Sequence, residues 1–243
     1  MRLEFLSGSA GPRTAPIRAV LFDLDGTLYR QRPLRAFMAA ELALRPLVDP
    51  RGAPALWRAL RSFRHAQEAL RREGERPGLA ARQIEMAAAA CGLETHTVAA
   101  LVEEWMQVRP LKYLARCRMP GTIEAFDALR AAEMPVGVLS DYPAAGKLRA
   151  LGLADRVAWS ICSTDPDVDA FKPHPKGFLR ACDRFGLPPS QVLMVGDRAD
   201  VDAAGAAAAG MPCIIIGRAA ASPVDHVLIP SLERLPSVLH ARC

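Results

Sequence analysis

Residues Ala19–Gly26 read Ala-Val-Leu-Phe-Asp-Leu-Asp-Gly. A short apolar run, Ala19–Asp25, that ends in carboxylates predicts a buried strand that stops at a functional site. Gly26 indicates that the backbone turns there, so whether Asp23 and Asp25 share a face depends on how regularly the strand continues. Two acids crowded at the mouth of a sheet raise each other's pKa, and a fold tolerates this where a cation or catalysis requires it.

The same pattern recurs downstream, where short apolar runs alternate with helical periodicity. This alternation predicts β-α-β units and a parallel sheet. We therefore expect an α/β fold with a Rossmann-like three-layer core. The further expected strands are Pro135–Ser140, Val157–Ser163, Val192–Gly196, Cys213–Ile216 and an edge strand at Val227–Ile229, and the expected core helices are Ile123–Ala132, Ala144–Leu151, Lys176–Phe185, Ala199–Ala209 and Leu232–Leu239.

One long stretch between the first two strands has no strand signal. Leu56, Leu60, Phe63 and Leu70 fall on one helical face, which indicates an amphipathic helix. We expect an all-helical insert over residues 33–117, a core formed by residues 17–32 and 118–243, and a flexible N-terminal extension over residues 1–16.

Composition excludes several classes of protein. The chain has 243 residues, of which 51% are hydrophobic and 23% charged, an ordinary globular balance. No apolar run approaches the roughly 18–20 residues of a membrane span, and the N-terminus lacks the apolar core of a signal peptide. The six cysteines form no Cys-x-x-Cys pair, which favours reduced thiols. These features predict a cytoplasmic protein and leave its oligomeric state open.

The net charge of +5 is unevenly distributed. Residues 30–118 hold 15 arginines and one lysine against nine acids, a local charge of +7. This excess fits either attraction of an anionic ligand or solvated helix faces paired at i,i+4. No basic strip is interleaved with aromatic residues, so we expect no nucleic-acid partner.

Further polar residues follow the other expected strands. Asp197 ends one of them, with Asp200 and Asp202 close behind, and such hard oxygen ligands suit Mg²⁺. Ser140 ends another strand and offers a hydroxyl, while Lys172 supplies a point charge for phosphate. Carboxylates, a metal, a hydroxyl and a lysine are the components of phosphoryl transfer.

Together these elements resemble the haloacid dehalogenase (HAD) superfamily. Its four motifs are matched in order by Asp23-x-Asp25-Gly26-Thr27, by Ser140, by Lys172-Pro173 and by Gly196-Asp197-x-x-x-x-Asp202. The helical insert resembles the C1 cap of subfamily I, and the chain as a whole resembles the phosphoglycolate-phosphatase-like members of that subfamily.

The resemblance implies a Mg²⁺-dependent phosphatase acting on a small anionic phosphorylated metabolite. Asp23 would be the nucleophile that forms an aspartyl-phosphate, Asp25 the general acid and base, and Thr27 would orient Asp25. Ser140 and Lys172 would hold phosphoryl oxygens. The metal would be held by Asp23, the main-chain carbonyl of Asp25, Asp197 and Asp202.

The expected substrate contacts are weaker inferences. Gly26 and Asp141 adjoin the motifs, and Arg30 and Arg35 follow the first of them. Asp141 replaces an asparagine common in relatives, and it either adds charge near the site or, as we favour, caps the helix near Ala144. Asp200 competes with Asp202 for the second metal role, and the motif spacing favours Asp202.

Two other functions remain as alternatives, and a third is disfavoured. Asp25 disfavours dehalogenation, because relatives that release halide need no second acid and lack one. A phosphomutase of the same fold would also use these residues. A non-catalytic binding module would keep the fold without turnover.

Overall fold

The structure is a computed structural model that describes residues 16–217 and 224–240 of the chain. Within these residues six strands form one sheet in the order β3-β2-β1-β4-β5-β6, and every neighbouring pair is parallel. The sheet confirms the expected α/β class. Its strands are β1 (Ala19–Phe22), β2 (Val136–Ser140), β3 (Trp159–Cys162), β4 (Val192–Gly196), β5 (Cys213–Ile216) and the edge strand β6 (Val227–Ile229).

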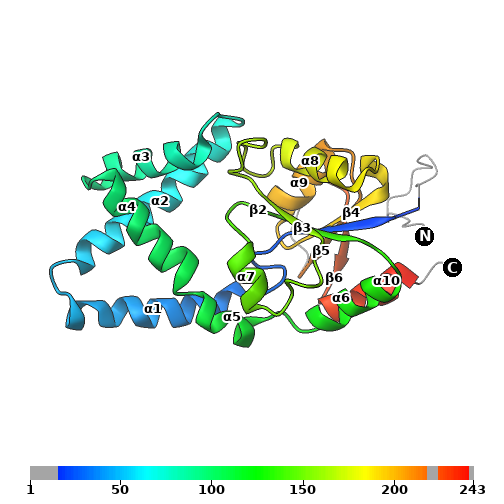
Figure 1. The fold of residues 1–243 in the computed structure, drawn as a ribbon, viewed down its shortest axis with the longest axis horizontal. Helices are drawn as coiled ribbons and strands as arrows, with labels where there is room; N and C mark the ends of the chain where they lie inside the picture. Colours follow the sequence, from blue (N-terminus) through cyan, green and yellow to red (C-terminus); the bar gives the residue numbers. More distant parts are fainter. Residues whose placement is uncertain (1–15, 218–223, 241–243) are drawn as a thin grey trace.

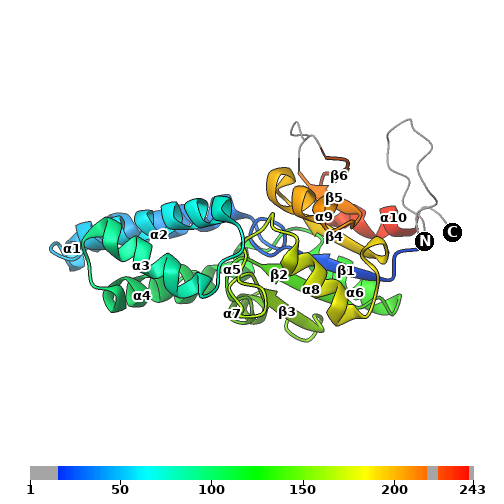
Figure 2. The same ribbon diagram turned by 90° about the horizontal axis from the view of Figure 1, so that it is seen from above.

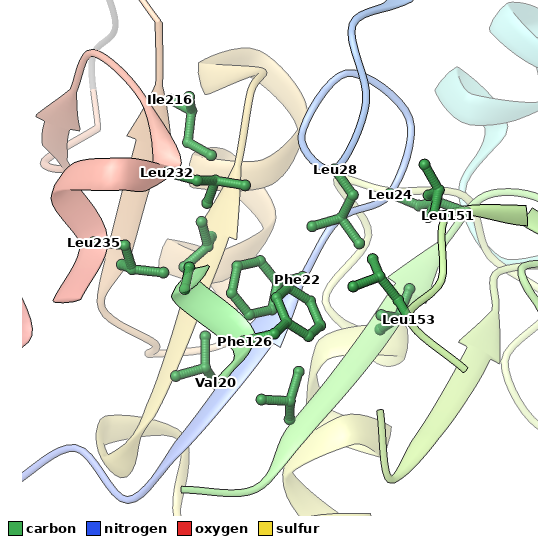
Figure 3. Packing of buried hydrophobic residues seen from close by; sticks show 14 of the residues in the cluster. Val20, Phe22, Leu24, Leu28, Phe126, Leu151, Leu153, Ile216, Leu232 and Leu235 are labelled. Carbon is green, nitrogen blue, oxygen red and sulfur yellow. The ribbon is translucent and has the colours of Figure 1, made fainter. Parts of the chain in front are cut away.

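Alternate residues of each strand face opposite helical layers, as the pleat requires. Val20 and Phe22 of β1 pack with Phe126, and the Phe22 and Phe126 rings stack with centroids 4.8 Å apart (Figure 3). Ala19 and Leu21 pack on the other face against Phe178. The core is therefore a three-layer sandwich. One layer holds α6 (Thr122–Ala131), α7 (Ala145–Ala150), the short helix η4 (Leu232–Arg234) and α10 (Leu235–His240), and the other holds α8 (Lys176–Phe185), η3 (Ala199–Ala203) and α9 (Ala204–Ala208), with η2 (Pro189–Gln191) leading into β4.

Between β1 and α6 the regular elements of the described chain are all helices, joined by turns and loops, apart from isolated bridges at Tyr29. Figures 1 and 2 show α1–α4 extending from one end of the core. Leu56, Phe63 and Leu70 are buried, as the apolar stripe predicts. The helices are α1 (Gln31–Val48), α2 (Ala53–Glu73), α3 (Leu79–Cys91), α4 (Thr95–Val102), η1 (Glu103–Val108) and α5 (Leu111–Cys117).

The helical part leaves and rejoins the core at adjacent points. The N–H of Arg30 donates to the carbonyl of Cys117 at 2.8 Å, and the N–H of Met119 donates to that of Leu28 at 3.0 Å. Because these two connecting segments, residues 28–30 and 117–119, are hydrogen-bonded to each other, they form a stalk on which the helices emerge beside the carboxyl end of β1. The first of these helices begins at Gln31, two residues before the expected start of the insert.

The first strand is shorter than the sequence predicts. β1 ends at Phe22, because the chain turns through Asp23–Leu28, with Gly26 at φ 112° and the N–H of Leu28 donating to the carbonyl of Leu24 at 3.0 Å. The two motif aspartates therefore lie on a turn rather than on one face of a strand.

Other expectations concern the chain ends and the thiols. The N-terminal extension, residues 1–16, lies outside the described residues except for Pro16. Five cysteines are buried and free, and Cys243 lies outside the described part. No helix in the described ranges has both the length and the apolarity needed to cross a membrane.

Candidate active site

The carboxyl ends of three central strands converge on one cavity. Asp23 follows β1, Asp141 follows β2 and Asp197 follows β4, and the parallel pairing of these strands brings all three to the same sheet edge. The cavity has a volume of about 590 Å³. Core residues line one side, and residues of α1, α2 and η1 line the other. A small molecule in this cavity would touch both parts of the protein.

Asp23 is buried and held by two donors. The ammonium of Lys172 lies 2.5 Å from its Oδ1, and the hydroxyl of Thr27 donates to its Oδ2 at 2.9 Å. Burial raises the pKa of Asp23 well above its usual range, and repulsion from Asp202 and Asp197 adds to this while Lys172 opposes it. The prediction that Thr27 orients Asp25 is wrong, because its hydroxyl faces the first aspartate of the turn.

Asp25 is positioned by a different set of donors. The ammonium of Lys147 lies 2.8 and 3.0 Å from its two oxygens, and the hydroxyl of Tyr29 donates to Oδ1 at 2.5 Å. Gln31 donates to its main-chain carbonyl. Burial alone would raise the pKa of Asp25, but Lys147 and Tyr29 outweigh burial and lower it. The two motif aspartates therefore differ in electrostatic character although they are two residues apart.

A cluster of three carboxylates offers a cation site. Asp23, Asp197 and Asp202 each present an oxygen, and these oxygens all lie within 4.8 Å of one another. Lys172 lies 2.7 Å from Asp202. Burial, together with repulsion from Asp202, raises the pKa of Asp197 to about 6. Asp200 pairs instead with Arg198 at the surface, so of the two candidates only Asp202 joins the cluster.

The Lys172 ammonium, which lies beside these carboxylates, is itself buried. Burial alone would lower the pKa of Lys172, but Asp202 and Asp23 together raise it. Lys172 is therefore a permanent positive charge between two of the carboxylates. A Cβ on Gly26 would overlap the Asp197 carboxylate, so the turn approaches the cluster as closely as a glycine allows.

The helix-capping role that we favoured for Asp141 is wrong. α7 begins at Ala145 with no side-chain cap. The Asp141 carboxylate instead accepts four hydrogen bonds: Arg71 at 2.7 Å, Gln67 at 3.2 Å, the Ser163 hydroxyl at 2.8 Å and the Lys172 N–H at 3.2 Å. Because Arg71 and Gln67 belong to α2, this residue joins the helical part to the core. The oxygens of Asp141 are already engaged by these four donors and do not cap the N-terminus of α7.

The remaining predicted residues lie at different distances from the chemistry. Ser140 is buried, and its hydroxyl accepts the N–H of Tyr142 at 3.3 Å without lining the cavity. Arg35 lines the cavity beside Gln31, whereas Arg30 does not line it and lies at the crossing of the chain.

Among the cavity cations missed from the sequence, two are largely buried. Lys147 is only 6% exposed and Arg71 has a side chain that is 10% exposed, yet both line the cavity. The one signal for Lys147 was its rarity, because the chain has four lysines in total, at 112, 147, 172 and 176. Arg71 had no such signal among the many arginines of the insert.

Comparisons with known proteins agree with this geometry. The profile of the family described as haloacid dehalogenase-like hydrolase matches residues 17–210. Phosphoglycolate phosphatase of Yersinia pseudotuberculosis is 31% identical over 235 residues, which cover 91% of this chain and 93% of that protein. Glyceraldehyde 3-phosphate phosphatase of Methanopyrus kandleri is 30% identical over 207 residues, with 83% and 84% covered.

The solved structures agree as well. A 2-haloacid dehalogenase from Pseudomonas syringae pv. Tomato superposes with a TM-score of 0.65 and 30% identity, covering 93% of this chain and 100% of that one. The fold, the ordered motifs and the family profile coincide on the same residues. The chain therefore belongs to the haloacid dehalogenase-like hydrolases.

Proposed function

We propose that this hydrolase is a Mg²⁺-dependent phosphatase that cleaves a small phosphate monoester through an aspartyl-phosphate. The observation that carries the proposal is the pairing of a buried Asp23, held by Lys172, with a second acid, Asp25, in one cavity. A leaving alcohol needs a proton and a leaving halide does not, so the second acid favours phosphate ester chemistry. The curated relatives named above are both phosphatases.

The donor set fits the metal. Asp23, Asp197 and Asp202 are hard oxygen ligands gathered within 4.8 Å, as Mg²⁺ prefers. The carbonyl of Asp25, which accepts the Gln31 amide, keeps a second lone pair. Bound Mg²⁺ would offset repulsion among the carboxylates and polarise the phosphoryl oxygens.

In the first step one carboxylate oxygen of Asp23 attacks phosphorus. The bond from phosphorus to the alcohol oxygen breaks, and Asp25 gives that oxygen a proton. In the second step Asp25 takes a proton from water, whose oxygen attacks phosphorus and releases Asp23 and inorganic phosphate. Lys172 holds phosphoryl oxygens in this scheme, and Thr27 fixes the orientation of Asp23. Ser140 would join Lys172 by turning its hydroxyl away from the N–H of Tyr142 and into the cavity.

The low pKa of Asp25 suits the base step, because the group rests as a carboxylate. The acid step requires a proton on Asp25. A phosphate dianion entering the cavity beside it raises its pKa and supplies that condition.

The helical insert, residues 33–117, acts as a cap domain in this proposal. It supplies one wall of the cavity through α1, α2 and η1. A closed cap excludes water and strengthens each electrostatic contact inside. Gly26, Arg35 and Asp141 adjoin the bound substrate in this scheme, with Arg30 at the stalk. The buried free thiols fit a reducing cytoplasm.

The test is hydrolysis of a panel of phosphorylated metabolites, with Mg²⁺ or EDTA. Phosphoglycolate and glyceraldehyde 3-phosphate belong on the panel, and 2-chloropropionate tests for dehalogenation. We expect phosphate release by wild type with Mg²⁺ only. Asp23→Asn abolishes it, whereas the surface variant Asp167→Asn, whose native side chain pairs with Arg180, does not.

Other outcomes identify the alternatives. Isomerisation of a sugar phosphate without net phosphate release would reveal a phosphomutase. Ligand binding without turnover of any substrate would reveal a binding module. Full activity in Asp23→Asn would overturn the mechanism.

A further inference from the structure

We infer that Arg71 binds a second anionic group on the substrate, so that the enzyme prefers phosphate monoesters whose alcohol portion is itself an anion. This inference rests on the phosphatase function proposed above and narrows its substrate class. The second group is a carboxylate or another phosphate, since both offer an arginine the same oxygen acceptors.

Arg71 is a buried cation with unused donors. Its side chain is 10% exposed, and Nη2 donates to Asp141 at 2.7 Å. Nε and Nη1 are buried and donate no hydrogen bond within the described part of the chain. Nη1 lies 3.7 Å from the Glu68 carboxylate, which is beyond hydrogen-bond distance. Because an arginine side chain stays protonated in proteins, leaving these buried N–H groups unpaired costs free energy, and a hydrogen-bond acceptor would remove that cost.

The side chain that carries these donors belongs to the wall of the catalytic cavity. Arg71 lines the cavity together with Asp23 and Asp25. Its partner Asp141 also accepts the N–H of Lys172, and the Lys172 ammonium holds Asp23. Arg71 is therefore connected to Asp23 through Asp141 and Lys172, and all four residues line the same cavity.

The phosphoryl group does not account for Arg71. In the proposed mechanism its oxygens are held by Lys172, on the core side of the cavity, where the carboxylates that would bind the metal also lie. Arg71 approaches from α2, on the opposite side, where the alcohol portion of the ester would lie. Asp141 holds the guanidinium by one nitrogen only and so fixes its orientation while leaving the others for the substrate.

A second cation supports the same subsite. Arg64 lies seven residues earlier on α2, on the same helical face, and lines the same cavity. It makes no ion pair or hydrogen bond with the described residues and is exposed. The nearby Glu68 and Asp141 carry the opposite charge, so an anion must outcompete Glu68 for Arg71.

The experiment compares substrates that differ only in the second anion. Phosphoglycolate is paired with 2-hydroxyethyl phosphate, and glycerol 1,3-bisphosphate with glycerol 3-phosphate, so the two pairs separate carboxylate from phosphate. p-Nitrophenyl phosphate, which has no second anion, reports on catalysis alone. The variants are Arg71→Gln and Arg71→Lys. The control is Arg72→Gln on the outer face of α2, where the native guanidinium bonds the Glu68 carbonyl.

We expect wild type to favour the anionic member of at least one pair. Arg71→Gln should raise the KM for that member about 10- to 100-fold, the usual effect of a lost charged hydrogen bond. Its loss of kcat/KM for p-nitrophenyl phosphate should be much smaller than its loss for the anionic substrate, because p-nitrophenyl phosphate offers Arg71 no second anion. Arg71→Lys should recover part of the loss because it keeps the charge, and Arg72→Gln should match wild type.

Two results would overturn the inference. Equal preference within both pairs would mean that no second anion is recognised. An equal loss by Arg71→Gln on every substrate, p-nitrophenyl phosphate included, would mean that Arg71 only ties the insert to the core. Wild type that hydrolyses nothing would instead refute the phosphatase proposal, and the subsite with it.

Discussion

Replacing Asp197 by asparagine should stabilise the metal-free protein, although it removes a proposed metal ligand. The Asp197 carboxylate accepts no hydrogen bond from the described residues and lies among Asp23 and Asp202. Burial and the charge of Asp202 raise its pKa from 3.8 to about 6, against the pull of Lys172 and Arg198. Ionised Asp197 therefore opposes folding.

The sign and size of the effect follow from this shift. A folded-state pKa above the unfolded value means that stability falls as the pH rises from about 4 to about 6 and stays low above it. At about 1.4 kcal/mol for each tenfold change, the difference between 3.8 and about 6 sets an upper limit of about 3 kcal/mol. Partial exposure of Asp197 reduces this, so we expect a gain of about 1–2 kcal/mol at pH 8.

Urea unfolding in EDTA, at pH 4.5 and pH 8, measures the effect. Asp197→Asn should have a larger free energy of unfolding than wild type at pH 8, and this difference should be much smaller at pH 4.5. Mg²⁺ should then stabilise wild type much more than the variant. Asp200→Asn is the matched control, because that carboxylate is exposed and paired with Arg198. If Asp197→Asn is no more stable than wild type at pH 8 without metal, the electrostatic reasoning fails.

Three further predictions concern other parts of the protein. Lys147→Met should lower kcat about 10²-fold, because Asp25 loses the ammonium that holds both its oxygens. The surface variant Lys112→Met should leave kcat unaltered. Equal kcat values for Lys147→Met and wild type would contradict the role of Lys147. Gly26→Ala should weaken Mg²⁺ binding about 10-fold or more in calorimetric titration, since the alanine Cβ would overlap the Asp197 carboxylate. The backbone φ of 112° at this position also disfavours any residue but glycine. The pKa of Glu41 is lowered to about 2 because three donors outweigh its burial, so the stability that ionised Glu41 contributes above pH 4.5 is lost as the pH falls toward 2. Thermal melts of Glu41→Gln should lack this loss. Equal dependence of Tm on pH in wild type and Glu41→Gln would refute the prediction.

Local regularities of the sequence were enough to predict the framework. β4 and β5 begin and end where the apolar runs do, and α8 matches its helical pattern at both ends. Asp23 and Asp197 were found because parallel strands deliver their carboxyl ends to one edge. These features depend on residues close in the chain and on backbone periodicity, which the order of amino acids records directly.

Only the tertiary structure decided which side chains meet. Lys147 contacts Asp25 across 122 residues and Arg71 contacts Asp141 across 70, so neither pair has a local signal. Thr27 faces Asp23 rather than Asp25 because the chain turns at Gly26 instead of continuing as a strand. Periodicity fixes which face of an element is apolar, but the position of α2 and α7 against the sheet edge depends on packing over the whole chain. The sequence by itself therefore determined the fold and the aspartates of the candidate site, and the packing of the helices determined the charges that surround these aspartates.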